Sequence, residues 1–117
     1  MATIRITNLK LRTIIGANDW ERDMKQDVVI NVTLDYDATK AIRSDNLKDT
    51  VDYKVITKKI IKAVESSNFM LLEKLASIVV DIVMENPRIN NTSVRIDKPL
   101  ALRFADSVSV ELHKKRK

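Results

Sequence analysis

Two segments near the start of the chain alternate between hydrophobic and polar residues, which is typical of strands with one buried face. Residues 4–15 alternate with a change of phase at Asn8, and this change predicts a β-bulge. Residues 27–36 repeat the alternation without interruption. The loop of about ten residues between the two strands begins at Gly16 and is longer than a hairpin requires. Because long ordered loops are often functional, this loop is a candidate for part of a site.

The middle of the chain changes to the period of helices. Residues 53–66 and residues 69–84 each carry a hydrophobic stripe at helical spacing. Asp52 and Asn68 are the residues that we expect to cap these two helices, and Asn86-Pro87 is expected to end the second one. The sequence therefore predicts two amphipathic helices that follow the first pair of strands.

Two short strands are expected to close the chain, around residues 93–97 and 107–112, while residues 40–49 form a polar connection. The order of elements is then ββααββ, an α+β fold with two helices on one face of an antiparallel sheet. Such a sheet leaves unpaired backbone groups at its edges. Joining the sheets of several subunits into a closed barrel would cover them.

The composition fits one globular domain, residues 1–112, followed by a basic tail at 113–117 that we expect to be disordered. Aromatic residues make up only 4% of the chain, so aliphatic side chains must form the core. No hydrophobic run approaches the roughly 20 residues of a membrane span, so no membrane partner is expected. Without cysteine there is no disulfide, zinc-thiolate site or cysteine nucleophile, and we expect a cytoplasmic protein.

The formal net charge of +5 is concentrated in the tail. Without residues 114–117 the chain has 21 − 4 = 17 basic residues against 16 acidic ones. A body that bound nucleic acid would carry the positive excess itself, so binding through the tail alone is a minor alternative and no nucleic-acid partner is expected. The only histidine, His113, lies in this tail, which argues against Ser-His and histidine–metal chemistry.

The chain contains a single glycine, Gly16, where average usage would give roughly eight. One glycine excludes the glycine-rich phosphate-binding loops of dinucleotide-binding and P-loop proteins. Other positions with positive φ must be occupied mostly by Asn or Asp. We therefore expect Gly16 to mark a place where no other residue fits.

Four short motifs occur in a characteristic order. They are Gly16–Glu21, Asp52-Tyr53, Leu71–Leu75 and Ile96–Pro99. Together with the ββααββ order, they resemble the bacterial dihydroneopterin aldolases and the related dihydroneopterin triphosphate epimerases, over residues 4–112. The resemblance implies the tunnelling fold (T-fold), in which four subunits close a barrel and two rings stack into a homo-octamer. It also implies a small pterin substrate.

The resemblance assigns roles that the pattern alone does not. By pattern, Glu73 is a solvated glutamate, and the resemblance makes it the anchor of the pterin ring, accepting hydrogen bonds from the 2-amino and N3 groups. By pattern, Lys98 is a surface lysine, and the resemblance makes it the general acid/base, acting through a water. Leu72 lies beside Glu73 in the same motif and is assigned to substrate binding.

Three further residues take roles from the resemblance. Tyr53 would by pattern be a packing residue, but the matching tyrosine reaches into a neighbouring subunit's site and handles the proton at the reacting carbon. Glu21 would by pattern be exposed, but the family's glutamate there contacts the substrate side chain. Val51 matches a position that lines the neighbouring site.

The implied reaction needs neither a cofactor nor a metal. In a retro-aldol cleavage, the imine at N5=C6 of a 7,8-dihydropterin accepts the electrons of the breaking C1′–C2′ bond. Protonation of the intermediate releases glycolaldehyde and 6-hydroxymethyl-7,8-dihydropterin, a step of folate biosynthesis. Re-addition of glycolaldehyde gives the 2′ epimer.

The motifs do not separate an aldolase from an epimerase. Residues 19–21 look like the aldolases, whereas residues 10–13 and 101–109 look closer to the triphosphate epimerases. Leu100 and Ser109 stand where the aldolases usually have glycine. Our first interpretation is a 7,8-dihydroneopterin aldolase, the alternative is a dihydroneopterin triphosphate 2′-epimerase, and the third is a non-catalytic assembly protein on the same fold.

Overall fold

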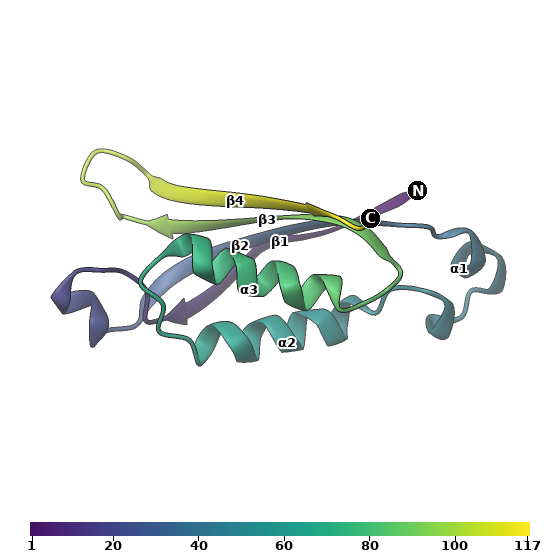
Figure 1. Cartoon of the computed structure of the whole chain (residues 1–117), viewed down its shortest axis with the longest axis horizontal. Coiled ribbons are helices and arrows are strands. Elements are labelled where there is room, and N and C mark those ends of the chain that lie inside the picture. Colours follow the sequence, from purple (N-terminus) through teal and green to yellow (C-terminus); the bar gives the residue numbers. More distant parts are fainter.

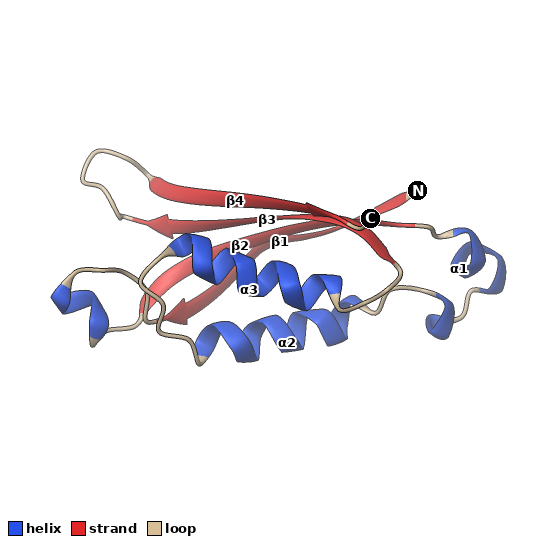
Figure 2. Ribbon diagram, in the orientation of Figure 1, coloured by secondary structure: helices blue, strands red, loops and turns tan.

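A computed structural model describes all 117 residues and places two helices on one face of a four-stranded antiparallel sheet (Figures 1 and 2). The elements are β1 (Ala2–Thr13), the 3-10 helix η1 (Asp19–Arg22), β2 (Gln26–Tyr36), α1 (Thr39–Ser44), the 3-10 helix η2 (Leu47–Asp49), α2 (Tyr53–Glu65), α3 (Leu72–Met84), β3 (Ile89–Pro99) and β4 (Ser107–Lys115). The strands lie side by side in chain order, so β1 and β4 form the two edges. The α+β prediction is confirmed.

The predicted bulge in β1 is present. The register against β2 shifts between Ile6 and Leu9, and Asn8 has a φ of 54°. The backbone N–H of Asn8 donates to Oδ1 of Asn31 on β2 at 2.9 Å. Asparagine visits this left-handed region more readily than most residues, so Asn8 suits the bulge.

The core lies between the helices and the face of the sheet that they cover. Alternate residues of β2 meet the hydrophobic stripes of α2 and α3, as the two periodicities predict. The core cluster has 18 buried residues, all of them aliphatic, which confirms the expectation from the scarcity of aromatics. The fully buried members of β2, α2 and α3 include Val28, Ile30, Leu34, Ile60, Val64, Leu75, Val79 and Val83.

Of the two predicted helix caps, one is present and the other is not. Asp52 caps α2 as predicted, because its Oδ1 accepts hydrogen bonds from the backbone N–H groups of Lys54 and Val55 at 3.1 and 3.4 Å. The prediction for Asn68 was wrong, since α3 begins at Leu72 and Asn68 lies in the connection before it. The Asn68 carbonyl accepts a hydrogen bond from the Arg22 side chain, which ties this segment to a distant loop.

Other differences concern short or edge segments. The polar connection at 40–49 holds α1 and η2, which are too short to show a hydrophobic period. Both C-terminal strands are longer than predicted. The expectation of a disordered tail was wrong for residues 113–115, because they continue β4 opposite residues 91–93 of β3. Pairing with β3 orders their backbone, although their sequence shows no alternation of hydrophobic and polar residues. No helix is long and apolar enough to cross a membrane.

The molecule is elongated, with extents of 52 × 25 × 24 Å, and its two ends differ. At one end, on the left of Figure 1, lie the loop after β1, the start of α3 and the β3–β4 connection. At the other end lie α1, η2 and the start of α2. Because α2 and α3 run in opposite directions, residues at their two starts are far apart within one chain.

Candidate active site

The three charged residues among the predicted site residues lie at the same end of the molecule. Glu21 is in η1, Glu73 is the second residue of α3, and Lys98 precedes the last residue of β3. In β2 and β3, Val29 stands opposite Asp97, so Lys98 lies level with the beginning of β2. Figure 1 shows α3 beginning at the end of the sheet where β3 ends. The topology therefore brings Lys98 to Glu21, which is 77 positions away in the sequence.

Lys98 is not the surface lysine that its pattern suggested. It continues the alternation of Val94 and Ile96, so its side chain lies on the helix-covered face of the sheet. That side chain is only 13% exposed, and its Nζ forms an ion pair with Oε2 of Glu21. Burial on this face directs the amine toward the loop after β1.

Glu21 is the only charged residue among the buried ones, at 3% exposure, so the reading of an exposed loop residue was also wrong. Its Oε1 accepts hydrogen bonds from the backbone N–H and the side-chain amide of Asn18, at 3.1 and 2.8 Å. Its Oε2 accepts from Nε2 of Gln26 at 3.0 Å and from Lys98. Each carboxylate oxygen thus has two donors.

These contacts decide the charge of Glu21. Burial alone would raise the pKa of its carboxyl, because it removes the charged form from water. The hydrogen bonds from Lys98, Gln26 and the backbone of Asn18, with the positive charge of Lys98, outweigh burial and lower this pKa to about 2. Glu21 is therefore ionised at neutral pH and holds the amine of Lys98 in place.

Gly16 makes room for this carboxylate. Its φ is 127°, in the region that favours glycine, and a Cβ at this position would overlap the carboxylate carbon and both oxygens of Glu21. The expectation that the single glycine marks a place where nothing else fits is confirmed by this geometry.

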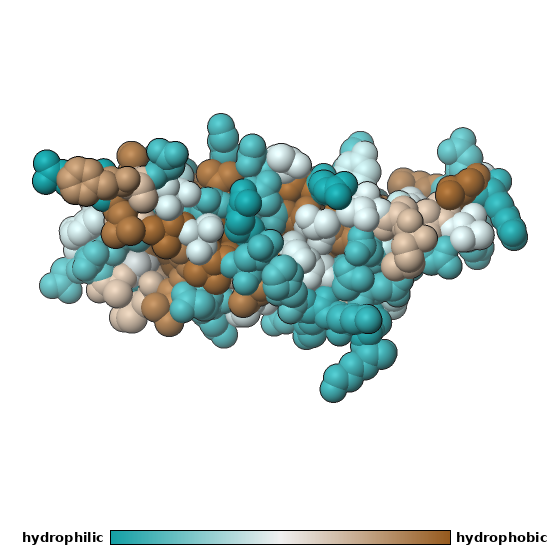
Figure 3. All heavy atoms as spheres, turned by 90° about the horizontal axis from the view of Figure 1, so that it is seen from above, coloured by the Kyte–Doolittle hydropathy of each residue, from teal (hydrophilic) through white to brown (hydrophobic).

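Glu73 and Leu72 begin α3 at this same end. Glu73 is exposed, and its carboxylate has no hydrogen-bond or ion-pair partner in the chain, so both of its oxygens are free to accept. Leu72 is partly buried against the core. Exposed hydrophobic residues lie nearby, and Figure 3 shows hydrophobic surface at this end of the molecule. They include Trp20, Met24, Met70, Leu71, Leu100, Leu102 and Phe104.

Tyr53 and Val51 lie at the opposite end. Tyr53 is the first residue of α2 and 53% exposed, whereas Val51 is buried in the core at 1% exposure. The helix α2 rises about 18 Å from Tyr53 to Glu65 before the chain turns toward Glu73. One chain therefore places Glu21, Leu72, Glu73 and Lys98 at one end of the molecule and Tyr53 and Val51 at the other.

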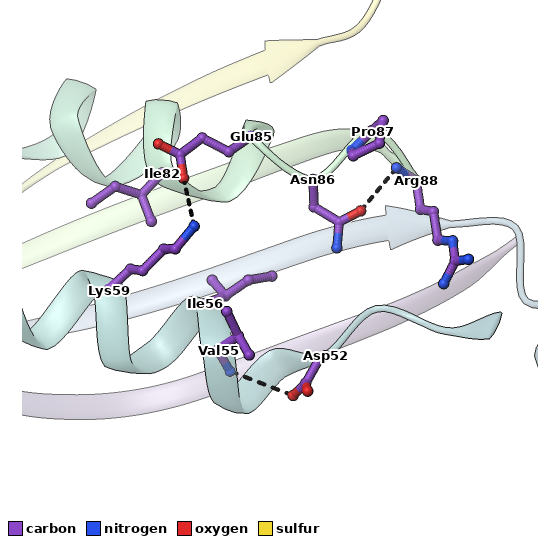
Figure 4. Close-up of a pocket in the computed structure, with 9 residues that line it drawn as sticks. All are labelled: Asp52, Val55, Ile56, Lys59, Ile82, Glu85, Asn86, Pro87 and Arg88. Carbon is purple, nitrogen blue, oxygen red and sulfur yellow. Dashed lines mark hydrogen bonds and ion pairs between the residues drawn. The ribbon is translucent and has the colours of Figure 1, made fainter. Parts of the chain in front are cut away.

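A pocket of about 440 Å³ lies between the start of α2 and the end of α3 (Figure 4). Lys59 and Glu85 form an ion pair there at 3.1 Å. The lining residues are Asp52, Val55, Ile56, Lys59, Ile82, Glu85, Asn86, Pro87 and Arg88. Glu21, Glu73 and Lys98 do not line this pocket. The candidate site is therefore placed at the charged groups and not at this pocket.

Sequence reasoning missed two residues that hold Glu21. Asn18 precedes Glu21 by three positions, which is the spacing of a capping box, and its backbone N–H donates to Oε1 of Glu21 at 3.1 Å. That spacing was a signal that could have indicated Asn18. Gln26 offers no such signal. It is the first residue of β2, and its side chain reaches Glu21 only because the strand begins beside the loop.

Nearly the whole chain matches a known family. A family model described as dihydroneopterin aldolase matches residues 4–113. The chain belongs to the dihydroneopterin aldolase family. The resemblance seen in the four motifs is thereby confirmed.

The chain is similar both to proteins named as epimerases and to proteins named as aldolases. A dihydroneopterin triphosphate 2′-epimerase of Escherichia coli is 50% identical, over 95% of this chain and 92% of the relative. A dihydroneopterin aldolase of the same organism is 33% identical, over 94% and 90%. The crystal structure of an E. coli dihydroneopterin aldolase in complex with neopterin superposes with a TM-score of 0.92 at 28% identity, over 97% and 99% of the two chains. The chain therefore has the T-fold of this family.

We expect Gly16→Ala to destabilise the protein by at least about 1 kcal/mol, because positive φ disfavours a Cβ and the Cβ overlaps Glu21. Urea unfolding at fixed protein concentration measures the loss. The same substitution in a Glu21→Ala background should cost less, since the overlapping carboxylate is gone. Equal costs in both backgrounds would show that Glu21 is not what requires glycine here.

The low pKa of Glu21 predicts a pH dependence of stability. The ordinary pKa is 4.5 and the folded-state pKa is about 2, so Glu21 stabilises the fold above pH 4.5 and loses this effect as the pH falls toward 2. The contribution is roughly 3 kcal/mol. Urea unfolding from pH 7 to pH 2.5 should show a loss that is smaller in Glu21→Gln, although that variant is less stable at pH 7. Parallel curves for the two proteins would contradict the assignment.

Proposed function

We propose that this enzyme is a 7,8-dihydroneopterin aldolase, which cleaves its substrate to 6-hydroxymethyl-7,8-dihydropterin and glycolaldehyde and forms the 2′ epimer from the same intermediate. The observation that carries the proposal is the buried ion pair of Glu21 and Lys98, at the end of the sheet where α3 presents Glu73. Family membership supplies the substrate class, and neopterin is the ligand named in the structure of the E. coli aldolase.

Each residue has a chemical task in this proposal. Glu73 accepts two parallel hydrogen bonds from the 2-amino and N3 groups of the pterin. Lys98, once its ammonium group has given up a proton, takes the proton of the 2′-hydroxyl through a water. Ionised Glu21 orients its amine and contacts the substrate side chain. The C1′–C2′ bond then breaks, its electrons pass to the N5=C6 imine, and glycolaldehyde forms. Leu72 is assigned to substrate binding beside Glu73.

The proposal includes a homo-oligomer with sites between subunits, as an octamer of two tetrameric rings. Tyr53 donates the proton to the reacting carbon, and Val51, whose side chain is buried in its own core, lines the site through its backbone, both from a neighbouring subunit. Two observations support this arrangement: Tyr53 lies at the far end of its own chain, and β1 and β4 are edges without a partner strand. A cytoplasmic location and the absence of a nucleic-acid partner stay predictions.

The second candidate is a dihydroneopterin triphosphate 2′-epimerase. It is favoured by 50% identity to the E. coli protein of that name, against 33% identity to the E. coli aldolase. Leu100 stands at a position where aldolases usually have glycine, and its φ of 61° lies in the left-handed region that favours glycine. The third alternative, a non-catalytic assembly protein, is disfavoured because Glu21, Glu73 and Lys98 lie at one end.

The test of function is to offer 7,8-dihydroneopterin and its triphosphate separately and to resolve the products by chromatography. We expect 6-hydroxymethyl-7,8-dihydropterin with some 2′ epimer from the first, and Lys98→Ala should lower this turnover by about 10²–10⁴. The matched control is Lys62→Ala, on the exposed side of α2. Epimerisation of the triphosphate without cleavage of either compound would favour the second candidate, and inertness toward both would refute the proposal.

Complementation between subunits tests the shared site. Lys98→Ala and Tyr53→Phe subunits should each be deficient in cleavage alone. When they are refolded together, about a quarter of the sites in a mixed ring combine an intact Lys98 with an intact Tyr53, if each interface joins unlike surfaces. Cleavage should therefore recover to a similar fraction of the wild-type rate. A mixture no more active than its components would show that the two residues do not share a site across subunits.

A further inference from the structure

Arg22 joins two segments that are distant in the sequence. One terminal nitrogen of its guanidinium, Nη1, donates to the carbonyl oxygens of Gly16 at 3.0 Å and Phe69 at 3.1 Å. The other terminal nitrogen, Nη2, donates to the carbonyl oxygen of Asn68. The side chain forms no ion pair with any carboxylate of the chain. Its planar set of donors is therefore used on backbone oxygens, which fix direction as well as distance.

The two segments carry the two halves of the candidate site. Arg22 follows Glu21 in η1, and Gly16 is the residue that makes room for the Glu21 carboxylate. Asn68 and Phe69 belong to the connection that leads into α3, where Glu73 lies in the first turn. Arg22 thus links the loop that holds the ion pair to the segment that sets the start of the helix with Glu73.

The remaining hydrogen bonds between the two segments lie close to the end of β1. The backbone N–H of Gly16 donates to the Phe69 carbonyl at 3.2 Å. The hydroxyl of Thr13 donates to the Ser67 carbonyl at 3.0 Å and lies 3.0 Å from the Ser67 hydroxyl. These contacts keep the segments together near β1, whereas Arg22 reaches across from η1. Removing its guanidinium should loosen the spacing without separating the segments.

We propose that Arg22 is a positioning residue that sets the distance between Glu73 and the Glu21–Lys98 pair. This inference rests on the proposed function, in which Glu73 holds the pterin ring and Lys98 acts on the side chain of the same substrate. The spacing of these groups then decides whether a bound ring presents its 2′-hydroxyl to the base. Misplacement of a reacting group by about 1 Å can cost about a hundredfold in rate.

The chain offers a matched control at its other end. Arg116 also donates to three backbone carbonyls, those of Ile89 at 2.9 Å, Met84 at 2.8 Å and Asn86 at 3.1 Å. It ties the end of β4 to the α3–β3 connection, away from Glu21, Glu73 and Lys98. Arg22→Met and Arg116→Met therefore remove the same kind of contact, but only Arg22 joins the loop with the Glu21–Lys98 pair to the segment before Glu73.

The experiment compares the full-length wild type, Arg22→Met, Arg22→Lys and Arg116→Met at equal oligomeric state, checked by sedimentation. Neopterin binding is followed by fluorescence, and kcat and KM are measured with the substrate that wild type turns over. We expect Arg22→Met to weaken neopterin binding about tenfold and to lower kcat/KM by about 10–100-fold. Arg22→Lys should fall between this variant and wild type, and Arg116→Met should stay within about twofold of wild type despite a lower Tm.

A purely structural role would appear as a loss of Tm in Arg22→Met, with binding and kcat within about twofold of wild type. That result, or an equal loss in Arg116→Met, would overturn the proposal. If Arg22→Met does not fold, Arg22→Lys carries the same comparison. Failure of wild type to bind neopterin or to turn over either substrate would refute the proposed function instead. Hydrogen exchange would then still test whether Arg22 links the two segments. Residues 16–23 and 66–73 should exchange faster in Arg22→Met than in wild type. Unchanged exchange would overturn the proposed link.

Discussion

The buried ion pair of Glu21 and Lys98 is the interaction on which this end of the protein depends. Removing two charges from water is costly, and their attraction offsets the cost only when the remaining hydrogen-bonding groups are satisfied. Asn18 and Gln26 supply those hydrogen bonds to the carboxylate, and Gly16 supplies the space. The loop after β1 is therefore built around one carboxylate, which explains why it is longer than a hairpin connection needs to be.

The arrangement of the helices imposes a second constraint. Since α2 and α3 run in opposite directions on one face of a 52 Å long molecule, the residues at their starts lie at opposite ends. A site that uses both Tyr53 and Glu73 has to be completed by a second chain. In the proposed function, the unpaired edges β1 and β4 pair with the sheets of neighbouring subunits. Assembly and catalysis thus follow from the same topology in the proposed function.

Elements with a long, regular pattern could be predicted from the sequence. The alternation in β2 and the stripes of α2 and α3 each repeat over several turns or pairs, so their positions followed from the residues alone. Short or edge elements could not be predicted in this way. The helix α1 has six residues, and the end of β4 is ordered by pairing with β3, whatever its own polarity. Asn68 looked like a helix cap because that preference is local, yet its carbonyl is held by Arg22 from another loop.

By itself the sequence determined the fold class, the aliphatic core, the bulge at Asn8 and the special status of Gly16, because each of these depends on a residue and its near neighbours. Only the tertiary structure decided that Glu21 and Lys98 are buried and paired. The alternation around Lys98 and the loop position of Glu21 are both compatible with exposure, and nothing local indicates a partner 77 residues away. The physical reason is that burial of a charge depends on what covers it, and the cover here comes from the loop after β1, the start of β2 and the end of β3, which meet only when the sheet and helices pack together.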